Sequence, residues 1–402
     1  MASAETLMSP PRDFLGPRQV LVGDGSSAQT GTALRSWTVP TGVIGVIADA
    51  VIAESGIAEP MLQNLNDSGY LPQIFTLPAG EPSVGVAQEA LDFLRATNCI
   101  AVVGIGGGSS MDVAKIAALS AVSDRDIVDF LGINPPAVPG LPLALIPTTS
   151  GTGAEVTRIS MLADQYGSKV ICSHSLLIPM IAVLDPMLLT GLPPSVTAAT
   201  GMDAIAHAVE AFMSLNRSPL TAQASLNAIA LMREWLPRAV ADGGDLDARR
   251  ATLFGAHYAG LALNAGVVLG HSLAYTIANR QHLPHGVTCA IALPYCVAYN
   301  AGGTFTGADE LALALTQGRS TRLEDASFEL QQLTADLGLP RSLAEVGIPI
   351  TMAEEMAREC IERYPRPTNP RSFDLTALTN LIKGMASGSV LDAGITTSHA
   401  NR

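Results

Sequence analysis

The pattern of hydrophobic residues changes about halfway along the chain. Up to about residue 190, short apolar runs alternate with longer stretches that have helical spacing. Strands that alternate with helices in this way predict a largely parallel sheet covered by helices on both faces. The clearest apolar runs predict an edge strand at 19–22 and buried strands at 43–48, 100–105 and 143–146, and part of a helix is predicted at 89–96.

The second half of the chain predicts helices only. From about Leu192 onward the β-branched runs disappear, and segments rich in Ala and Leu follow at 219–235, 247–264 and 327–337. The change comes after Asp185-Pro186 and at the turn Leu192-Pro193-Pro194. We therefore expect an α/β domain at residues 1–190 and an all-helical domain at residues 191–402.

Composition excludes several classes of protein. Of 402 residues, 48% are hydrophobic and 15% are charged, which favours two domains with large cores over a disordered chain. The net charge of −13, without a basic stripe, argues against nucleic acid as a partner. The start of the chain lacks the pattern of a signal peptide, and five scattered cysteines fit reduced thiols in a core, so we expect a cytoplasmic protein. The uncharged run 251–279 contains histidines, asparagines and four glycines, and it predicts a buried helix or helix pair rather than a membrane span.

A glycine-rich segment lies between a predicted strand and a predicted helix. Gly106-Gly107-Gly108-Ser109-Ser110 follows the strand at 100–105 and precedes the apolar stretch 111–119. Glycines let the backbone approach a phosphate closely, and the N–H groups of the first helical turn favour negative charge. The segment matches neither the GxGxxG pattern, because position 109 is Ser, nor a P-loop. We expect it to bind a pyrophosphate; a tight turn without a ligand is the alternative.

Two further segments end predicted strands where open α/β sheets bind ligands. The segment 147–153, PTTSGTG, offers hydroxyl groups that could hold a nicotinamide or a ribose. Asp49 ends the strand at 43–48, where its carboxylate could accept a hydrogen bond from a ribose 2′-OH and so favour NAD over NADP. The alternative for Asp49 is a helix N-cap.

Four residues of the second half form a candidate ligand set for one divalent metal. Asp203 and His207 are four residues apart on a predicted helix, so their side chains can converge on one point. His271 and His285 lie in segments with few charges, where an unpaired imidazole would be costly to bury. Metal binding is therefore favoured over ordinary hydrogen-bonded core residues, although His282 is a rival to His285. The set fits Fe²⁺, Zn²⁺, Co²⁺ or Ni²⁺.

Four motifs in this order resemble the iron-containing, or group III, alcohol dehydrogenase family over nearly the whole chain. They are GGGSSMDVAK at 106–115, PTTSGTGAEVT at 147–157, TGMDAIAHAVE at 200–210 and HSLAYTIANRQHLPHGV at 271–287. The resemblance implies a dinucleotide-binding N-terminal domain, a helical C-terminal domain, a fold like that of dehydroquinate synthase, and a homodimer. It also implies that iron is the metal.

The resemblance also assigns roles to residues. It implies metal ligation by Asp203, His207, His271 and His285, and NAD preference set by Asp49. One departure concerns Tyr275, which stands where many members have the second histidine of HxxxH, often assigned to proton relay; Tyr275 could pass a proton or shape the pocket. The resemblance further implies pyrophosphate contacts from Gly106, Gly107, Gly108 and Ser109, and contacts to the nicotinamide half or the ribose from Thr148, Thr149, Thr152 and Lys169.

These residues predict reversible hydride transfer between a small alcohol and its carbonyl compound, with NAD carrying the hydride and the metal polarising the substrate oxygen. A Tyr at this place, Tyr275, is similar to the hydroxyacid-oxoacid transhydrogenase branch, which is one short match, and a transhydrogenase with bound NAD is therefore an alternative. A metal-free enzyme similar to the maleylacetate reductases is a second alternative, against which the intact ligand set argues. A dehydroquinate synthase and a non-catalytic binding protein are more distant possibilities.

Overall fold

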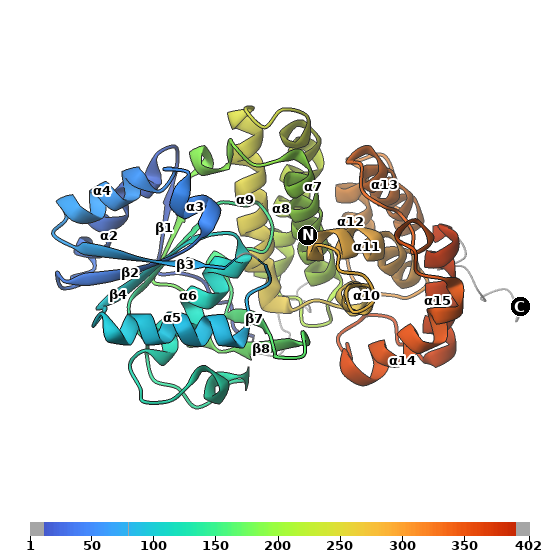
Figure 1. Ribbon diagram of the computed structural model, residues 1–402. Helices are drawn as coiled ribbons and strands as arrows, with labels where there is room; N and C mark the ends of the chain where they lie inside the picture. Colours follow the sequence, from blue (N-terminus) through green and yellow to red (C-terminus); the bar gives the residue numbers. More distant parts are fainter. Residues whose placement is uncertain (1–11, 79, 391–402) are drawn as a thin grey trace, which may run out of the picture. The chain divides into compact units, whose positions relative to one another are not determined.

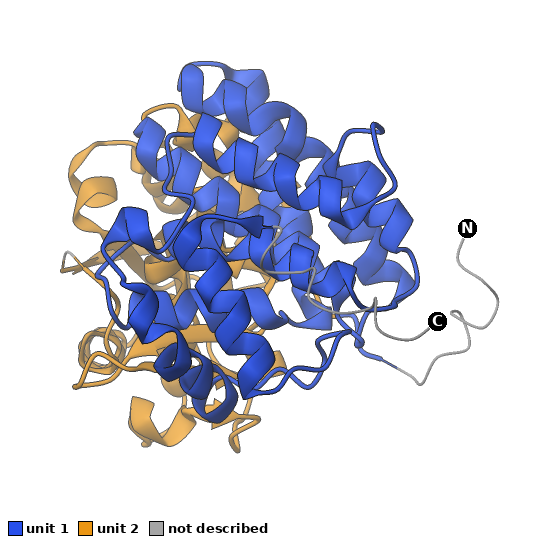
Figure 2. Cartoon of the chain, turned by 90° about the vertical axis from the view of Figure 1, so that its right-hand side faces the viewer, with its two compact units in different colours: residues 1–14, 192–402 blue, residues 15–191 orange. Residues whose placement is uncertain are grey.

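The computed structural model describes residues 12–390 except residue 79, and the chain separates into two compact units (Figure 2). Among the described residues, unit 2 comprises residues 15–191, and unit 1 comprises residues 192–390 together with the short segment 12–14. This short segment was expected in the first domain. It clusters instead with unit 1, where Arg12 Nη1 donates a hydrogen bond to the carbonyl of Arg217 at 3.4 Å.

Unit 2 is built on a six-stranded sheet with the strand order β1-β9-β6-β4-β2-β3, in which every pairing is parallel. The largely parallel sheet is therefore confirmed. Each of the four predicted strands lies in this sheet with ends that differ from the prediction by at most one residue, and the first lies at an edge. The strands are β1 (Gln19–Val22), β2 (Val43–Asp49), β3 (Leu71–Leu77), β4 (Ala101–Gly106), β6 (Leu143–Pro147) and β9 (Ile181–Leu184).

Helices cover both faces of this sheet (Figure 1). Helices α5 (Val84–Ala96) and α6 (Gly108–Ser120) lie on one face, and α2 (Thr30–Ser36) and α4 (Glu59–Asp67) lie on the other. Helix α5 begins where the Ser83 hydroxyl accepts a hydrogen bond from the N–H of Val86, a typical N-cap. Helix α6 is buried over most of its length, because it follows the central strand β4 directly.

A second, three-stranded sheet of unit 2 was not predicted. It contains β5 (Gly132–Ile133), β8 (Lys169–Ser173) and β7 (Ile159–Ala163) in that order, and β7 and β8 are antiparallel. These strands are short and only partly buried, so their sequences lack the continuous apolar runs that identified the central strands.

Unit 1 is helical throughout its described residues, as predicted. Its centre is α7, which is buried almost without interruption from Thr197 to Met213. Among the described residues, no single helix has the length and apolar composition needed to cross a membrane; only α9 with the turn after it, joined to α10 across a 108° bend, would have both. The helices are α7 (Pro194–Met213), α8 (Pro219–Ala241), α9 (Leu246–Ala262), α10 (Leu269–Ala278), α11 (His285–Ala301), α12 (Ala308–Leu315), α13 (Leu323–Asp336), α14 (Ala353–Arg363) and α15 (Leu375–Ser387).

Candidate metal centre and cofactor loops

Helix α7 carries three ionisable side chains on one stripe. Asp203, His207 and Glu210 occupy positions i, i+4 and i+7, which lie above one another on a helix face. They are 3%, 8% and 1% exposed, in a helix whose other residues are mainly apolar. Because buried charges require compensation, this stripe needs partners from neighbouring helices.

Helices α10 and α11 bring two more histidines to this stripe. The Nε2 atoms of His207, His271 and His285 lie 3.7, 3.9 and 3.7 Å from one atom, Oδ1 of Asp203. The rings of His207 and His271 stack with centroids 4.8 Å apart. All four predicted metal ligands are therefore brought together within unit 1. The rival His282 is exposed, in the segment between α10 and α11, and is not part of the cluster.

The surroundings of the Asp203 carboxylate suit a bound cation. Its Oδ1 is buried and accepts no hydrogen bond from the residues that the structure describes, which is costly for a carboxylate oxygen. Burial alone would raise the pKa of Asp203, but charge interactions with His207, His285 and His271 outweigh burial and lower it. Tetrahedral ligands about 2.1 Å from a metal lie roughly 3.4 Å apart, close to the observed spacings. The donor set fits a divalent metal.

Glu210 holds His271 and the start of α10 in place. Its Oε1 lies 2.6 Å from Nδ1 of His271, and its Oε2 accepts hydrogen bonds from the N–H groups of Val268 and His271 at 2.9 and 3.2 Å. Gly270 permits this approach, since a Cβ there would lie 2.6 Å from Oε1. Glu210 was not predicted from the sequence, although its place seven residues after Asp203 puts it on the same helix face.

Cys289 also lies at the cluster. It follows His285 by one turn of α11, and its Sγ lies 3.5 Å from Nε2 of His285 and 4.0 Å from Nε2 of His271. Burial, followed by the negative charges of Asp203 and Glu210, raises the pKa of this thiol. From the sequence, Cys289 was predicted only as a core residue. Its spacing of four from His285 repeats that of Asp203 and His207 and could have indicated this position.

Tyr275 lies beside the candidate ligands. Its ring stacks on that of His285 with centroids 5.5 Å apart and an interplanar angle of 14°, and it meets His271 edge-on at 6.0 Å. The ring of Tyr364 also contacts that of Tyr275, with centroids 5.1 Å apart and an interplanar angle of 52°. Burial raises the pKa of Tyr275, so its phenol keeps its proton at neutral pH.

In unit 2, the two predicted cofactor segments meet at the carboxyl ends of β4 and β6. The N–H of Thr148 donates to the carbonyl of Gly106 at 2.9 Å, and Gly106 has a φ of +145° that side chains rarely permit. A Cβ at Gly107 would lie 3.6 Å from Thr149, and one at Gly108 would lie 2.7 Å from Thr152. Gly107 is the N-cap of the 13-residue helix α6 and offers no side-chain cap, so the first turn of this helix can serve an anion. Ser109 is exposed there.

Asp49 is a helix N-cap, the alternative given for it above, and its carboxylate also faces the glycine segment. Its Oδ1 caps the short helix α3 (Ala50–Glu54) by accepting a hydrogen bond from the N–H of Ile52 at 2.9 Å. Its Oδ2 would lie 3.1 Å from a Cβ at Gly106. The structure pairs Lys169 Nζ with the carboxylate of Glu81, so the cofactor role of Lys169 stays a prediction.

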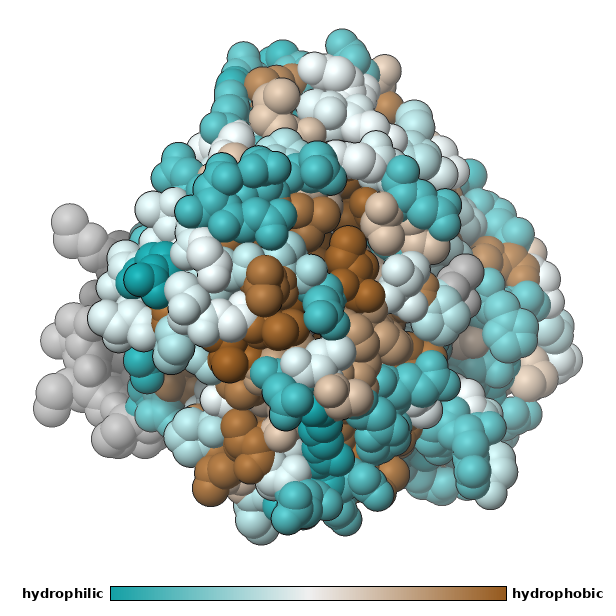
Figure 3. Space-filling view, turned by 60° about the vertical axis from the view of Figure 1, so that its left-hand side comes forward, coloured by the Kyte–Doolittle hydropathy of each residue, from teal (hydrophilic) through white to brown (hydrophobic). Residues whose placement is uncertain are grey.

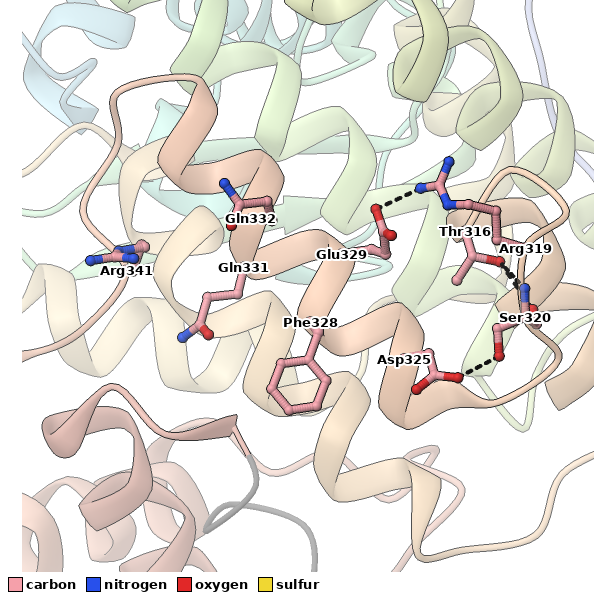
Figure 4. A pocket seen from close by; sticks show the side chains of 9 residues that line it. All are labelled: Thr316, Arg319, Ser320, Asp325, Phe328, Glu329, Gln331, Gln332 and Arg341. Carbon is pink, nitrogen blue, oxygen red and sulfur yellow. Dashed lines mark hydrogen bonds and ion pairs between the residues drawn. The ribbon is translucent and has the colours of Figure 1, made fainter.

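A surface cavity of about 520 Å³ lies along α13, away from the residues discussed above (Figure 4). Its charged side chains pair with their neighbours: Arg319 with Glu329 at 2.7 Å, and Ser320 with Asp325 at 2.5 Å. None of the candidate ligands or cofactor residues lines it. Cavity volume therefore does not identify the site; the convergence of donors does.

The chain is similar to known proteins along most of its length. The model of iron-containing alcohol dehydrogenases matches residues 17–186, and that of the C-terminal part of the Fe-containing alcohol dehydrogenase family matches residues 197–386. The chain is 37% identical to long-chain-alcohol dehydrogenase 1 of Geobacillus thermodenitrificans over 79% of this chain and 82% of that protein. It is 31% identical to NAD-dependent methanol dehydrogenase of Bacillus methanolicus, over 92% and 99% of the two chains.

A solved structure supports the same assignment. Sulfoacetaldehyde reductase from Bifidobacterium kashiwanohense, in complex with NAD⁺, superposes with a TM-score of 0.86 at 26% identity, covering 94% of this chain and all of that one. The matches extend over both units, so the likeness is not confined to one motif. The chain belongs to the iron-containing alcohol dehydrogenase family.

Proposed function

We propose that this protein is an NAD(H)-dependent alcohol dehydrogenase that interconverts a small alcohol and its aldehyde at a divalent metal held by Asp203, His207, His271 and His285. The observation that carries the proposal is the convergence of three imidazole Nε2 atoms on Oδ1 of Asp203, which accepts no hydrogen bond from the described residues. When bound, the metal supplies Lewis acidity toward the substrate oxygen, and the nicotinamide donates or accepts the hydride.

Glu210 prepares His271 for ligation. A carboxylate only accepts hydrogen bonds, so the contact of 2.6 Å between its Oε1 and Nδ1 of His271 places the proton on Nδ1. The lone pair of Nε2 then faces Asp203 Oδ1. An acidic residue behind a ligating histidine fixes the tautomer and the ring orientation, and it raises the basicity of the ligand.

Tyr275 acts as a neutral phenol beside the ligands. Because burial raises its pKa, it can donate a hydrogen bond to a substrate oxygen but does not act as a base at neutral pH. Its stacking on His285 also fixes the orientation of that imidazole. This supports Tyr275 as a group that positions the ligand and the substrate in place of the histidine of HxxxH.

Separate observations support NAD as the cofactor and iron as the metal. The glycine segment and the adjoining threonines support a pyrophosphate site, and Asp49, whose carboxylate faces Gly106, supports NAD over NADP. The NAD⁺ complex of sulfoacetaldehyde reductase and the name of the methanol dehydrogenase support the same cofactor. Iron is supported by the family description, while the donor atoms alone also suit Zn²⁺.

A homodimer in the cytoplasm completes the proposal. Figure 3 shows hydrophobic side chains gathered among hydrophilic ones on one face of the molecule. In unit 2, strand β3 pairs only with β2 among the described strands, and it exposes Leu71 and Ile74. An open, partly apolar edge strand is a surface that a second copy can cover.

The experiment compares metal content and NAD⁺-dependent alcohol oxidation in wild-type protein, in His271→Ala and in the control His282→Ala. We expect about one Fe or Zn per chain in wild type and in His282→Ala. In His271→Ala we expect loss of the metal and a fall in activity of at least about 100-fold, since a metal contributes several kcal/mol to such a reaction.

Two results would replace the proposal. Full activity of wild-type protein without metal would favour a metal-free reductase. Transfer of hydride from a hydroxy acid to an oxo acid without added nicotinamide would favour a transhydrogenase with bound NAD, the alternative raised by Tyr275.

A further inference from the structure

The geometry around the candidate metal includes a donor outside the four predicted ligands. Cys289 is 1% exposed, and its Sγ lies within 4.8 Å of the donor atoms of Asp203, His271 and His285, as those atoms do of one another. This group of four does not include His207. Among the described residues, Cys289 thus belongs to the same close group of donors as His271 and His285.

The spacing suits a sulfur ligand. A metal with ligand bonds of about 2.3 Å to sulfur and about 2.1 Å to nitrogen has these two atoms roughly 3.6 Å apart in a tetrahedral site. The distances from Cys289 Sγ to the Nε2 atoms of His285 and His271 are 3.5 and 4.0 Å, on either side of that value. The sulfur therefore stands at the separation expected of a ligand to the same ion.

The packing of α11 fixes this arrangement. His285 and Cys289 lie one turn apart on the same face of α11, as Asp203 and His207 do on α7. Gly286 lets the first turn of α11 approach α7, because a Cβ there would lie 2.0 Å from the carbonyl oxygen of Ala199. The same approach that brings His285 to Asp203 also brings Cys289.

The observation that supports the proposed metal centre also bears on Cys289. The buried Oδ1 of Asp203 accepts no hydrogen bond of normal geometry from the described residues, and the Cys289 thiol interacts with the same carboxylate. A carboxylate oxygen in that state, with imidazoles about 3.7 Å away, is compensated by a positive ion at the centre of the group.

We propose that Cys289 is a thiolate ligand of the metal in addition to Asp203, His207, His271 and His285, and that it biases the centre toward Zn²⁺ or Co²⁺ over Fe²⁺. The inference rests on the metal centre proposed above. On binding, the Sγ–H proton passes to solvent, a bond forms between Sγ and the metal, and no atom changes oxidation state. Thiolate sulfur is a softer donor than carboxylate oxygen or imidazole nitrogen, and it favours Zn²⁺ over harder ions such as Mn²⁺.

The test is Co²⁺ bound to protein from which the native metal has been removed by chelation. Visible ligand-field bands report that Co²⁺ is bound, and a near-ultraviolet thiolate-to-cobalt band reports that sulfur is a ligand. We compare wild type with Cys289→Ser, Cys289→Ala and the control Cys296→Ala. Cys296 is buried seven residues later on α11, where its Sγ accepts a hydrogen bond from Nδ2 of Asn300 at 3.6 Å.

We expect the near-ultraviolet band in wild type and in Cys296→Ala but in neither Cys289 variant, with the visible bands retained in all four proteins. The Kd for Zn²⁺ should rise by at least about 10-fold in Cys289→Ser, because even partners behind the ligands cost this much. The Kd for Mn²⁺ should rise less. If Cys289 had only a structural role, its substitution would weaken the binding of Zn²⁺ and of Mn²⁺ equally.

The outcomes separate the two proposals. Visible bands without a near-ultraviolet band in wild type, or a near-ultraviolet band that persists in Cys289→Ser, would overturn the thiolate ligand and leave the metal centre intact. Failure of wild-type protein to bind Co²⁺ at all would overturn both.

Discussion

Each unit buries a charged side chain, and the two are compensated differently. In unit 2, Nζ of Lys115 on α6 donates hydrogen bonds to Oγ1 of Thr157 at 2.9 Å and to the carbonyl of Ile159 at 2.8 Å, with Asp112 at 3.7 Å. In unit 1, Oδ1 of Asp203 on α7 accepts no hydrogen bond from the described residues. Burial of a charge alone therefore does not mark a site; a buried charge whose compensation is missing does.

Lys115 and Asp112 hold α6 against β7 and the residues just before it. Burial lowers the pKa of Lys115, against the opposing charges of Asp112 and Glu155, and burial raises the pKa of Asp112 against the charge of Lys115. Asp112 also accepts a hydrogen bond from the N–H of Met161 on β7 at 3.0 Å. Each charged group is thus held by protein atoms alone, whereas the imidazoles around Asp203 stand too far from its Oδ1 for hydrogen bonds.

The largest expected effect on stability comes from breaking the buried ion pair between Lys115 and Asp112. Lys115→Met removes the cation and leaves Asp112 without its buried partner, which should lower the free energy of unfolding by about 3 to 5 kcal/mol. Metal content should be unchanged in the folded fraction. Denaturant unfolding followed by circular dichroism measures the loss, and Lys383→Met, at an exposed position of α15, is the control. Normal stability with loss of bound metal would reverse the assignment of roles to the two clusters.

A smaller effect should follow from removing the charge of Glu210, which holds His271 in place beside Asp203. Glu210→Gln keeps the shape of the side chain but removes the charge that holds Nδ1–H of His271, so metal affinity should fall by about 10- to 100-fold. Competition with a chromogenic chelator measures this Kd. Glu329→Gln, in the remote ion pairs with Arg233 and Arg319, should leave it unchanged. Equal affinities in all three proteins would show that Glu210 only caps α10.

The same contrast explains what the sequence could predict. Asp203 and His207 could be predicted as a pair because their spacing alone places both side chains on one helix face. Glu210 and Cys289 were missed because their importance depends on how α7, α10 and α11 pack, which local spacing does not encode. Asp49 shows a further limit, since one carboxylate both caps α3 and faces Gly106. The central strands were predicted from continuous burial, and β7 and β8 were missed because they are short and partly exposed.

The smallest expected effect tests whether a single unpaired buried atom is enough to mark a site. Ser110, in the first turn of α6, and Ser120, at the end of that helix, both bury a hydroxyl that has no hydrogen-bond partner among the described residues. Removing such a group relieves a desolvation cost, so Ser110→Ala and Ser120→Ala should each change the free energy of unfolding by no more than about 1 kcal/mol, toward greater stability.

The KM for NADH separates the two hydroxyls in function. Ser110 lies at the glycine segment, where its Oγ would be 2.4 Å from a Cβ at Gly106, whereas Ser120 lies at the far end of α6. We expect KM to change by less than about twofold in both variants, since a neutral hydroxyl without converging donors lacks what distinguishes Asp203. A rise in KM in Ser110→Ala alone would instead make Ser110 a cofactor contact, and unit 2 would then also hold a buried polar group whose partner is a ligand.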